Sequence, residues 1–423
     1  MAGWISRRQL APLRVSGFRF LFYSTLASSL GTLLAAIALA IDVKDRTDSG
    51  LWVGAVLLVE FLPTVVVGLF FGPLLDRLER RSLMIGADLV RTGVFCALPF
   101  AHSAGLIVGL AAVAGLANGF FRPAAFASVP NLVPAEELSE ANALLVAIEN
   151  VSWAIGPVLG GLLTAAAGPN AAYWINAASF LLSATLVSRI SARQLQSETA
   201  LTRGHWRDLG DGFRVVARSR ALLAVLVGWG IASFGIGAAN VAEVFLAKNI
   251  FDAGDFGYGL LYGAIGLGLV VGSFWSSRLI DAIGTARAYG LALALMALGF
   301  TGAALSPNVW VAAVACVVTG LGDGAAIVCN ATLVQRGAPD LMRGRALTLV
   351  MSATYAAMGI GTVVAGALLS QGNARWVWIG AGIACALAAV VGYALARGSA
   401  EANVGPAPPP APPEPTQYEV AAH

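Results

Sequence analysis

Charged residues are scarce in this chain of 423 residues: Asp, Glu, Lys and Arg make up 12% of it, while 58% of the residues are hydrophobic. Together with a mean hydropathy of +0.77, this composition lies outside the range of water-soluble domains. Lysine is nearly absent, with only Lys44 and Lys248. No G-x-x-x-x-G-K-[ST] phosphate-binding loop can therefore form, which excludes ATP binding of the P-loop kind.

Histidine and cysteine are also few. They stand at His102, His205, His423, Cys96, Cys316, Cys329 and Cys385. No two of them show the spacing of a metal site or a disulfide framework, and no G-x-S-x-G motif occurs. We therefore expect no metal, no cofactor and no enzymatic activity. The small net charge of +3 gives no reason to expect a nucleic-acid partner.

Long apolar runs are what the chain has instead. A helix needs roughly 20 apolar residues to cross the hydrocarbon core. Twelve such segments are predicted, near residues 18–41, 51–75, 82–101, 105–127, 141–167, 171–189, 221–247, 257–280, 286–305, 308–334, 346–370 and 375–396. Since the runs lack the alternation of a barrel strand, we predict an all-α membrane protein.

Basic residues predict the orientation of these spans. Except for Lys44, Arg46, Lys248 and Arg375, all Lys and Arg residues lie on the side of the N-terminus. Because basic loops stay in the cytoplasm, we expect both termini there, in a multi-pass protein of the plasma (inner) membrane. The first 20 residues are a basic lead-in to the first span and do not look cleavable.

The order of the spans predicts four regions. They are an N-terminal six-helix bundle (1–190), a polar cytoplasmic linker (191–220), a C-terminal six-helix bundle (221–397) and a disordered Pro-rich cytoplasmic tail (398–423). A constant shift of 205 residues relates features of the halves, among them Asp76 and Asp281, and Gly161 and Gly366. Such a duplication predicts two pseudo-symmetric bundles around a central cavity.

Two motifs indicate a family. The stretch "GPLLDRLERR" (72–81) is similar to the G-x-L-x-D-R-x-G-R-[RK] signature of the major facilitator superfamily. "AIGPVLGG" (154–161) resembles its antiporter motif, and "FFRPAAFASVPNLVPAEELSEANAL" (120–144) is similar to the drug, macrolide and enterobactin exporters. The chain departs from the pattern at Glu79, where the loop signature has glycine, and at Thr32, where many relatives have an acid.

The loop signature predicts a cytoplasmic gate. Its residues, together with acids within reach, are Gly72, Asp76, Arg77, Arg80, Arg81, Asp88 and Asp281. By the family geometry, Asp76 would accept hydrogen bonds from the start of a helix in the other half, and the arginines would pair with acids such as Asp88. The alternative is a solvated basic loop, which any membrane protein has.

The antiporter motif predicts a bend and a close contact in the fifth span. The motif residues are Gly156, Pro157, Gly160 and Gly161. Pro157 removes a helical hydrogen bond, and Gly156 and Gly160, four residues apart, form a flat face. We expect this face to pack against Gly268 and Gly272 in the eighth span. Ordinary packing of small residues is the alternative.

Acids inside the spans are candidates for proton coupling, because a charge at mid-membrane costs about 2.5–3.5 kcal/mol. Glu60 lies about 14 Å into the second span, and Glu149 and Asp323 are also well inside theirs. Arg122 would stabilise an ionised acid or meet an anionic substrate. Substrate contact or a structural hydrogen bond are alternatives for Glu60.

Other polar and aromatic residues are harder to assign. Asp42, Glu243 and Asn240 lie nearer the outer ends, where pairing at a gate or plain solvation explains them as well. Candidates to line the substrate cavity are Phe61, Phe120, Phe121, Trp153, Phe234, Asn240 and Tyr355. Placement against lipid is the alternative for each aromatic residue.

The resemblance implies a secondary active transporter that exports hydrophobic or amphipathic small molecules of the drug, macrolide or siderophore class. It would work by proton antiport and alternating access, in the lipid bilayer, as a monomer. The nearest alternative is an uptake or lysophospholipid-flipping carrier of the same fold. A membrane enzyme would need a catalytic cluster, and a sensor would be expected to add a folded soluble domain; neither is found in the sequence.

Overall fold

The computed structural model describes residues 10–70, 78–195, 216, 219–338, 343–369 and 373–398. All regular elements in these ranges are helices. The N-terminal half contains α1 (Ser16–Thr47), α2 (Gly50–Phe70), α4 (Arg80–Ala97), α5 (Ala104–Leu132), α6 (Leu138–Ala167), α7 (Pro169–Ser188) and the short α8 (Ala192–Leu195). The C-terminal half contains α10 (Arg220–Leu223), η4 (Ala224–Trp229), α11 (Gly230–Phe245), η5 (Leu246–Ile250), α12 (Gly254–Ile283), α13 (Thr285–Leu305), α14 (Val309–Gly337), α15 (Arg343–Leu369) and α16 (Ala374–Ala396).

The predicted spans correspond to these helices. In the described residues, eleven helical spans are long and apolar enough to cross a membrane, and α2, with its apolar stretch Gly50–Glu60, supplies a twelfth. The seventh span, Arg220–Ile250, is one run of α10, η4, α11 and η5, in which η4 and η5 are π-helical. The prediction of an all-α membrane protein with twelve spans is confirmed.

Local sequence sets several helix ends. The side chains of Ser103, Asn308 and Asn373 accept hydrogen bonds from the first backbone N–H groups of α5, α14 and α16. Gly168 and Gly284, at φ 76° and 81°, end α6 and α12, in a conformation that residues with a Cβ rarely adopt. Polar caps and glycines therefore separate spans that are otherwise uniformly apolar.

The helices pack in the same pattern in both halves. In the N-terminal half, α1 packs against α6 and α7, and α5 packs against α2 and α4. In the C-terminal half, α11 packs against α15 and α16, and α14 packs against α12 and α13. Each contact of one half thus has a counterpart in the other, as the repeat of 205 residues predicts.

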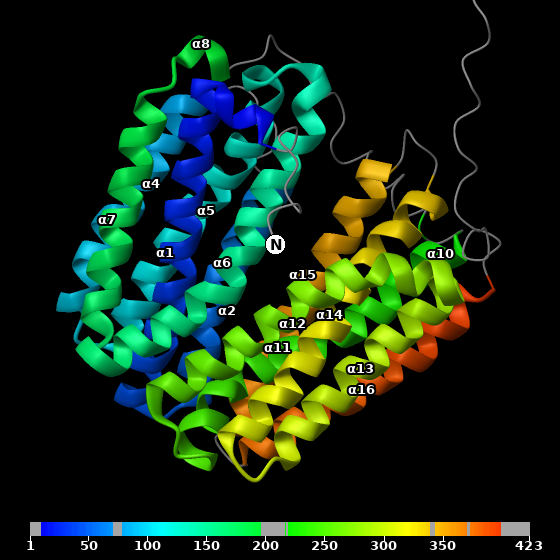
Figure 1. Cartoon of the computed structure of the whole chain (residues 1–423). Helices are drawn as coiled ribbons and strands as arrows, with labels where there is room; N and C mark the ends of the chain where they lie inside the picture. Colours follow the sequence, from blue (N-terminus) through cyan, green and yellow to red (C-terminus); the bar gives the residue numbers. More distant parts are fainter. Residues whose placement is uncertain are drawn as a thin grey trace, which may run out of the picture.

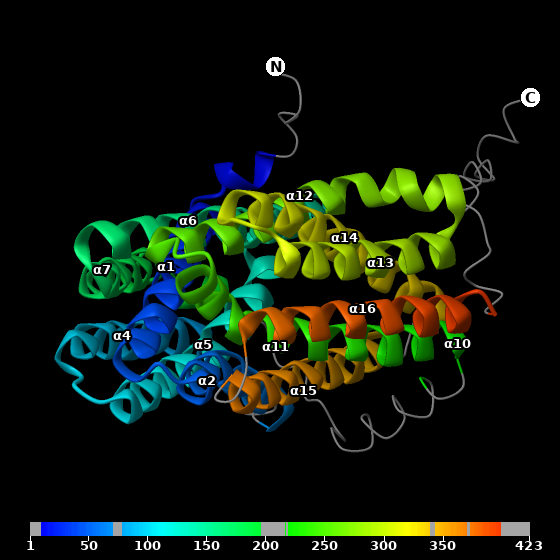
Figure 2. The same ribbon diagram turned by 90° about the horizontal axis from the view of Figure 1, so that it is seen from below.

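Two helix pairs join the halves, α6 with α12 and α2 with α15, and both pairs lie side by side in Figure 2. Glycines allow the close approach. A Cβ on Gly161 would lie 2.8 Å from the Cα of Gly259, and one on Gly366 would lie 2.9 Å from the carbonyl oxygen of Gly50. Gly161 and Gly366 are also related by the 205-residue repeat, so equivalent glycines form both interfaces.

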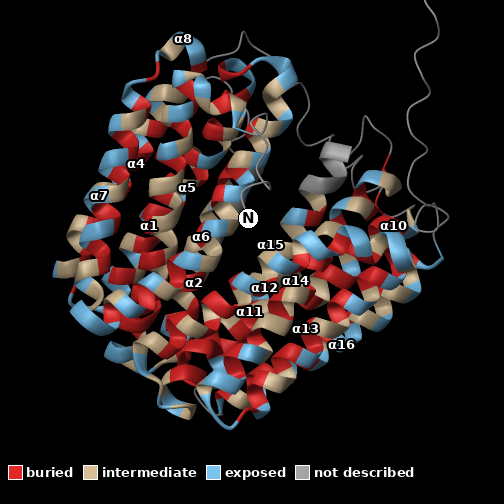
Figure 3. Ribbon diagram, viewed as in Figure 1, coloured by how far each residue is buried: buried red, intermediate tan, exposed pale blue. Residues whose placement is uncertain are grey.

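The two halves meet mainly at one end of the molecule. Figure 1 shows them leaning apart at the end that holds α8 and α10, which we call the open end, and converging at the opposite, closed end. Buried residues lie inside each bundle and along the closed end (Figure 3), whereas large apolar side chains such as Phe274 (78% exposed) point outward. This outward apolar surface suits contact with lipid.

Candidate functional site: a central cavity and its charged residues

A cavity of about 300 Å³ lies between the halves. Its walls come mostly from α1, α2, α4, α5, α6 and α7, with α11, α12 and α15 completing them. The lining mixes aliphatic and aromatic side chains with a few charged ones. Such a surface can hold an apolar molecule and orient its polar groups.

Seven of the predicted site residues line this space. Four are predicted cavity residues, namely Phe121, Trp153, Asn240 and Tyr355, and three are proton-coupling candidates, namely Glu60, Arg122 and Glu149. Phe120 and Phe234 are not among its lining residues, and the side chain of Phe61 is outside the described part of the structure. Each of these seven side chains lies where it can contact a substrate in the cavity. The contact itself stays a prediction.

Arg122 and Glu149 form an ion pair across α5 and α6. The guanidinium donates two hydrogen bonds of 2.9 Å, one to each carboxylate oxygen, and lies over the Phe126 ring at 5.8 Å. It also interacts with the hydroxyl of Tyr355 on α15. This group therefore connects the N-terminal half to the C-terminal half across the cavity.

Glu60 lies on α2 and faces the cavity. In the described part of the chain, no hydrogen bond or ion pair of its carboxyl group is found. Three residues later, Pro63 interrupts the hydrogen bonds of α2. Glu60 is thus an acid at the cavity wall whose charge has no fixed partner among the described residues.

Asp323 is placed differently from the other predicted acids. It lies on α14 inside the C-terminal bundle and is not among the cavity-lining residues. It interacts electrostatically with Tyr262 of α12 and Cys385 of α16. Because Tyr262 lines the cavity, Asp323 is one side chain removed from it.

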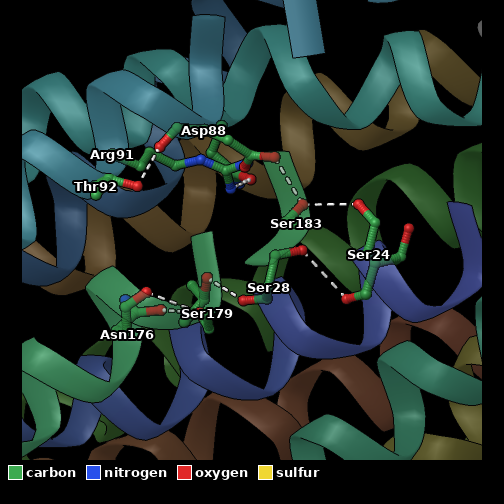
Figure 4. A network of polar contacts seen from close by, with 11 residues as sticks. Ser24, Ser28, Asp88, Arg91, Thr92, Asn176, Ser179 and Ser183 are labelled. Atoms are coloured by element: carbon green, nitrogen blue, oxygen red, sulfur yellow. Dashed lines mark hydrogen bonds and ion pairs between the residues drawn. The ribbon is translucent and has the colours of Figure 1, made fainter. Parts of the chain in front are cut away.

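Asp88 and Arg91 form a buried ion pair within α4, shown in Figure 4. The Ser183 hydroxyl donates a hydrogen bond to Asp88 at 2.6 Å. It is also hydrogen-bonded to the Ser24 hydroxyl at 2.7 Å. Arg91 donates to the Asn118 side chain at 3.2 Å. The pair is only 0% and 3% exposed at its side chains, so each charge depends on the other.

Aromatic rings hold the guanidinium of Arg91. It lies 4.6 Å from the centre of the Phe121 ring and 4.2 Å from that of Phe180. Cation–π contacts of this kind stabilise a charge away from water. A second aromatic contact, between Trp153 and Tyr262 at 5.8 Å and 14°, stacks one half on the other beside the cavity.

The gating loop is only partly described. Gly72, Asp76 and Arg77 lie outside the described residues. Arg80 donates to the carbonyl oxygens of Ala127 (2.7 Å) and Leu195 (3.1 Å).

The other gate residues differ from the predicted pairing. Arg81 donates to the carbonyl oxygen of Ser188 at 2.6 Å, and Asp281 is exposed. Asp88 pairs with Arg91 of its own helix, because this residue lies one turn further along the same face. A gating role for this set stays a prediction.

The antiporter motif packs against α12, which is the predicted eighth span, but not at the predicted glycines. α6 runs through Pro157, with Gly156 and Gly160 facing α1 and Gly161 facing Gly259 of α12. Gly268 and Gly272 instead face Val317 and Leu321 of α14. The expected contact with these two glycines is wrong, because they lie on the face of α12 that turns into its own bundle.

A set of ion pairs joins the halves at the closed end. The Lys248 ammonium group on η5 contacts Asp45 of α1 at 2.7 Å and Asp255 of α12 at 2.6 Å. We call these three residues the closed-end latch. Nearby, Lys44 of α1 lies 5.9 Å from the ring centre of Phe245, which adds a second contact between the halves.

Asp42 and Glu243 near this end have different surroundings. Asp42 accepts hydrogen bonds from Arg46 (2.7 Å) and from Tyr173 (2.9 Å). Glu243 is 1% exposed, and its Oε1 atom has no hydrogen-bond partner among the described residues. Plain solvation is therefore the wrong explanation for Glu243.

Sequence reasoning missed several residues of the site. They are Arg91, Asn118, Tyr258, Tyr262 and the buried position of Glu243. The spacing of Asp88 and Arg91, three residues apart on one helix, was a usable signal for their pairing. Nothing in the sequence marked the tyrosines, since aromatic residues occur on all faces of the spans.

Comparison with known families agrees with this architecture. The model of the family MFS_3, described as "Transmembrane secretion effector", matches residues 7–421. The chain belongs to this family. The predicted resemblance to the major facilitator superfamily and its exporter-like members is confirmed.

Similar proteins of known name cover nearly the whole chain. The multidrug efflux pump Tap of Mycolicibacterium fortuitum is 25% identical over 399 residues, which are 89% of this chain and 95% of Tap. Macrolide efflux protein A of Streptococcus pyogenes is 22% identical over 370 residues, which are 83% of this chain and 90% of that protein.

Solved structures share the fold. A bacterial homologue of the iron transporter ferroportin in an inward-facing state has a TM-score of 0.73 at 16% identity, covering 90% of this chain and 98% of its own. A bacterial homologue of the lysosomal transporter Spinster, inward-facing and unoccupied, has a TM-score of 0.71 at 13% identity, with coverage of 94% and 100%.

Proposed function

We propose that this protein exports hydrophobic or amphipathic small molecules from the cell by proton antiport with alternating access. The observation that carries the proposal is the cavity between the halves, where aromatic side chains surround a few charged groups. The printed names of two relatives, a multidrug efflux pump and a macrolide efflux protein, support drug-like substrates.

The direction of opening follows from the proposed topology. With both termini in the cytoplasm, as the basic loops predict, the open end of the molecule faces the cytoplasm and the closed-end latch faces outward. A substrate would then reach the cavity from inside the cell. Rocking of the halves about α6–α12 and α2–α15 would open the latch and close the other end.

Within the cavity we assign the charged residues two roles. Arg122 and Glu149 orient the polar groups of a substrate. Their charges compensate each other in an ion pair with two hydrogen bonds, so both side chains keep a fixed position. Glu60, which has no such partner among the described residues, exchanges protons with the cavity. Asp323, one side chain away, is a second candidate to bind a proton.

The loop signature and the antiporter motif serve the rocking motion in this proposal. Arg80 and Arg81 hold the start of α4 against backbone carbonyls of the N-terminal half. Because Gly161 has no side chain, α6 and α12 pack closely, and they stay in contact while the halves rock about this helix pair. Asp76 would add the contact across the halves at the cytoplasmic end.

Efflux of ethidium and erythromycin from cells that produce the protein tests the proposal. We expect faster efflux than from cells with an empty vector, and loss of the difference when a protonophore collapses the gradient. Glu60→Gln should abolish gradient-driven efflux, whereas the matched change Glu136→Gln on the exposed η3 (Ala135–Glu137) should not.

Two results would contradict it. Increased accumulation of both compounds would favour an uptake carrier of the same fold. Unchanged efflux in the presence of the protonophore would remove proton antiport from the proposal.

A further inference from the structure

Glu243 stands out among the acids because it is sealed from solvent. It lies on α11 five residues before Lys248, is 1% exposed, and its Oε1 atom is buried without a hydrogen-bond partner among the described residues. Nearly all buried polar atoms in proteins are hydrogen-bonded, so an unpartnered buried carboxyl oxygen calls for an explanation.

No cation among the described residues compensates the charge that an ionised Glu243 would carry. Groups that interact with it electrostatically are Tyr258 and Tyr262 of α12 and Cys316 of α14. Both nearby lysines are engaged elsewhere, Lys248 in the closed-end latch and Lys44 with Asp48 at 3.4 Å. Among the described residues, the carboxyl therefore faces hydroxyls, a thiol and carbon atoms.

Burying an ionised carboxylate without a partner costs far more than burying the neutral acid. Glu243 therefore carries a proton in the conformation seen here, and it can lose this proton only when water reaches it or when another acid takes the proton in exchange. Water can arrive when η5 and α12 separate from α1, that is, when the closed-end latch opens. Protonation of Glu243 and closure of the latch are thus linked.

Tyrosine hydroxyls connect this site to the cavity. Tyr258 and Tyr262 both line the cavity and both interact electrostatically with Glu60 as well as with Glu243. Their rings contact each other edge to face, with centres 6.2 Å apart. A proton that leaves Glu243 therefore has hydroxyl groups to move along towards the Glu60 carboxylate.

We infer that Glu243 is the proton-binding site of the C-terminal half. It takes up a proton when the latch is open, its neutral form allows the latch to close, and the proton then passes by way of Tyr258 and Tyr262 to Glu60 at the cavity. In this transfer Glu243 becomes a carboxylate only as the Glu60 carboxylate becomes neutral. The direction of this proton transfer rests on the proposed function. The protonated state of Glu243 does not depend on that function.

Infrared spectroscopy tests the protonated state without any substrate. Purified full-length protein in lipid vesicles at pH 8 should show the carbonyl stretch of a protonated carboxyl, with little shift in deuterated water because the site is sealed. Glu243→Gln should remove the Glu243 contribution to this band, while the contribution of Asp323, which is also proposed to be neutral, remains. Glu136→Gln, at an exposed site, should leave the band unchanged. A spectrum that is unchanged by Glu243→Gln would overturn the inference.

Transport by the same vesicles tests the coupling. With ethidium as the probe, Glu243→Gln should lose transport driven by an imposed pH gradient by at least tenfold, while ethidium counterflow without a gradient is retained. This split shows that the fold and the cavity are intact. Retention of gradient-driven transport would overturn the inference.

A second variant covers a structural failure of the first. Glu243→Asp keeps an acid at this position, and it should restore gradient-driven transport with a shifted pH profile. If Glu243→Gln and Glu243→Asp are equally inactive in counterflow, the residue is structural and the inference is wrong. If the wild-type protein shows the infrared band but its ethidium transport does not respond to a pH gradient, the proposed proton antiport is wrong. The assignment of Glu243 as a proton-binding site is then still supported.

Discussion

The two halves share a packing pattern but treat buried charge differently. In the N-terminal half, three acids inside the spans pair with an arginine of the same half: Asp88 with Arg91, Glu149 with Arg122, and Asp42 with Arg46. Glu60, at the cavity wall, has no such partner among the described residues. In the C-terminal half, the two acids inside the spans, Glu243 and Asp323, have no cationic partner among the described residues.

This difference indicates a division of work between duplicated halves. A paired charge has its counterion built in and keeps one state, which suits a wall that positions substrates. An unpaired buried acid is stable only as the neutral form, so it must gain or lose a proton whenever its access to water changes. The paired charges of the N-terminal half would thus shape the cavity, while Glu60 at its wall and the unpaired acids of the C-terminal half would respond to protons.

The largest effect should come from breaking the most buried pair. Asp88→Ala leaves the Arg91 guanidinium uncompensated at 2% exposure, and we expect it to lower the free energy of unfolding by about 3–5 kcal/mol. Thermal unfolding in detergent measures this, with Asp281→Ala at an exposed position as the control. Equal stability of both variants would show that the pair does not support the fold.

A smaller effect is expected at the cavity pair, because it is partly exposed. Glu149→Gln removes one partner of Arg122 and should weaken ethidium binding by about fivefold, or about 1 kcal/mol. The exchange Arg122→Glu with Glu149→Arg should recover part of the loss. Fluorescence titration measures the affinity, and unchanged binding in Glu149→Gln would separate the pair from the substrate site.

The latch should have a modest effect that depends on salt. Lys248→Ala removes the ion pair with Asp45 that joins the halves and should favour opening by about 0.2–1 kcal/mol, less at high ionic strength. The rate at which a thiol reagent labels a cysteine placed at Asn240 reports the opening. Asp48→Asn, which changes an ion pair with Lys44 that lies within the N-terminal half, should change this rate less.

The smallest effect on stability is expected in the C-terminal half. Since Asp323 is proposed to be neutral in this conformation, Asp323→Asn should leave the unfolding temperature within about 1 °C of wild type. Gradient-driven ethidium transport should nevertheless fall. A large loss of stability would mean that the acid is charged and has a partner, and the contrast between the halves would disappear.

The fold could be predicted closely because crossing a bilayer fixes the length and the apolar character of each helix. The ends of the predicted spans fall within a few residues of most observed helices, as for residues 171–189 and α7 (Pro169–Ser188). The duplication was visible as well, because the glycines at the two interfaces recur at one spacing.

The orientation of each helix about its axis could not be predicted in the same way. A span that is apolar on all sides has no hydrophobic stripe to show which face packs where. The two glycines assigned to the Gly156–Gly160 face were therefore wrong, although α6 does pack against α12 as predicted. Glu243 was judged by its depth along the helix, although its neighbours seal it. Only the three-dimensional packing showed that Tyr258 and Tyr262 interact with both Glu243 and Glu60.

The most direct test of coupled export uses purified protein in vesicles with a fluorescent pH indicator inside. When ethidium is added to wild-type vesicles, we predict proton movement opposite to ethidium movement, absent in Glu243→Gln and kept in Glu136→Gln. Ethidium movement through the wild-type protein with no counter-movement of protons would contradict the account.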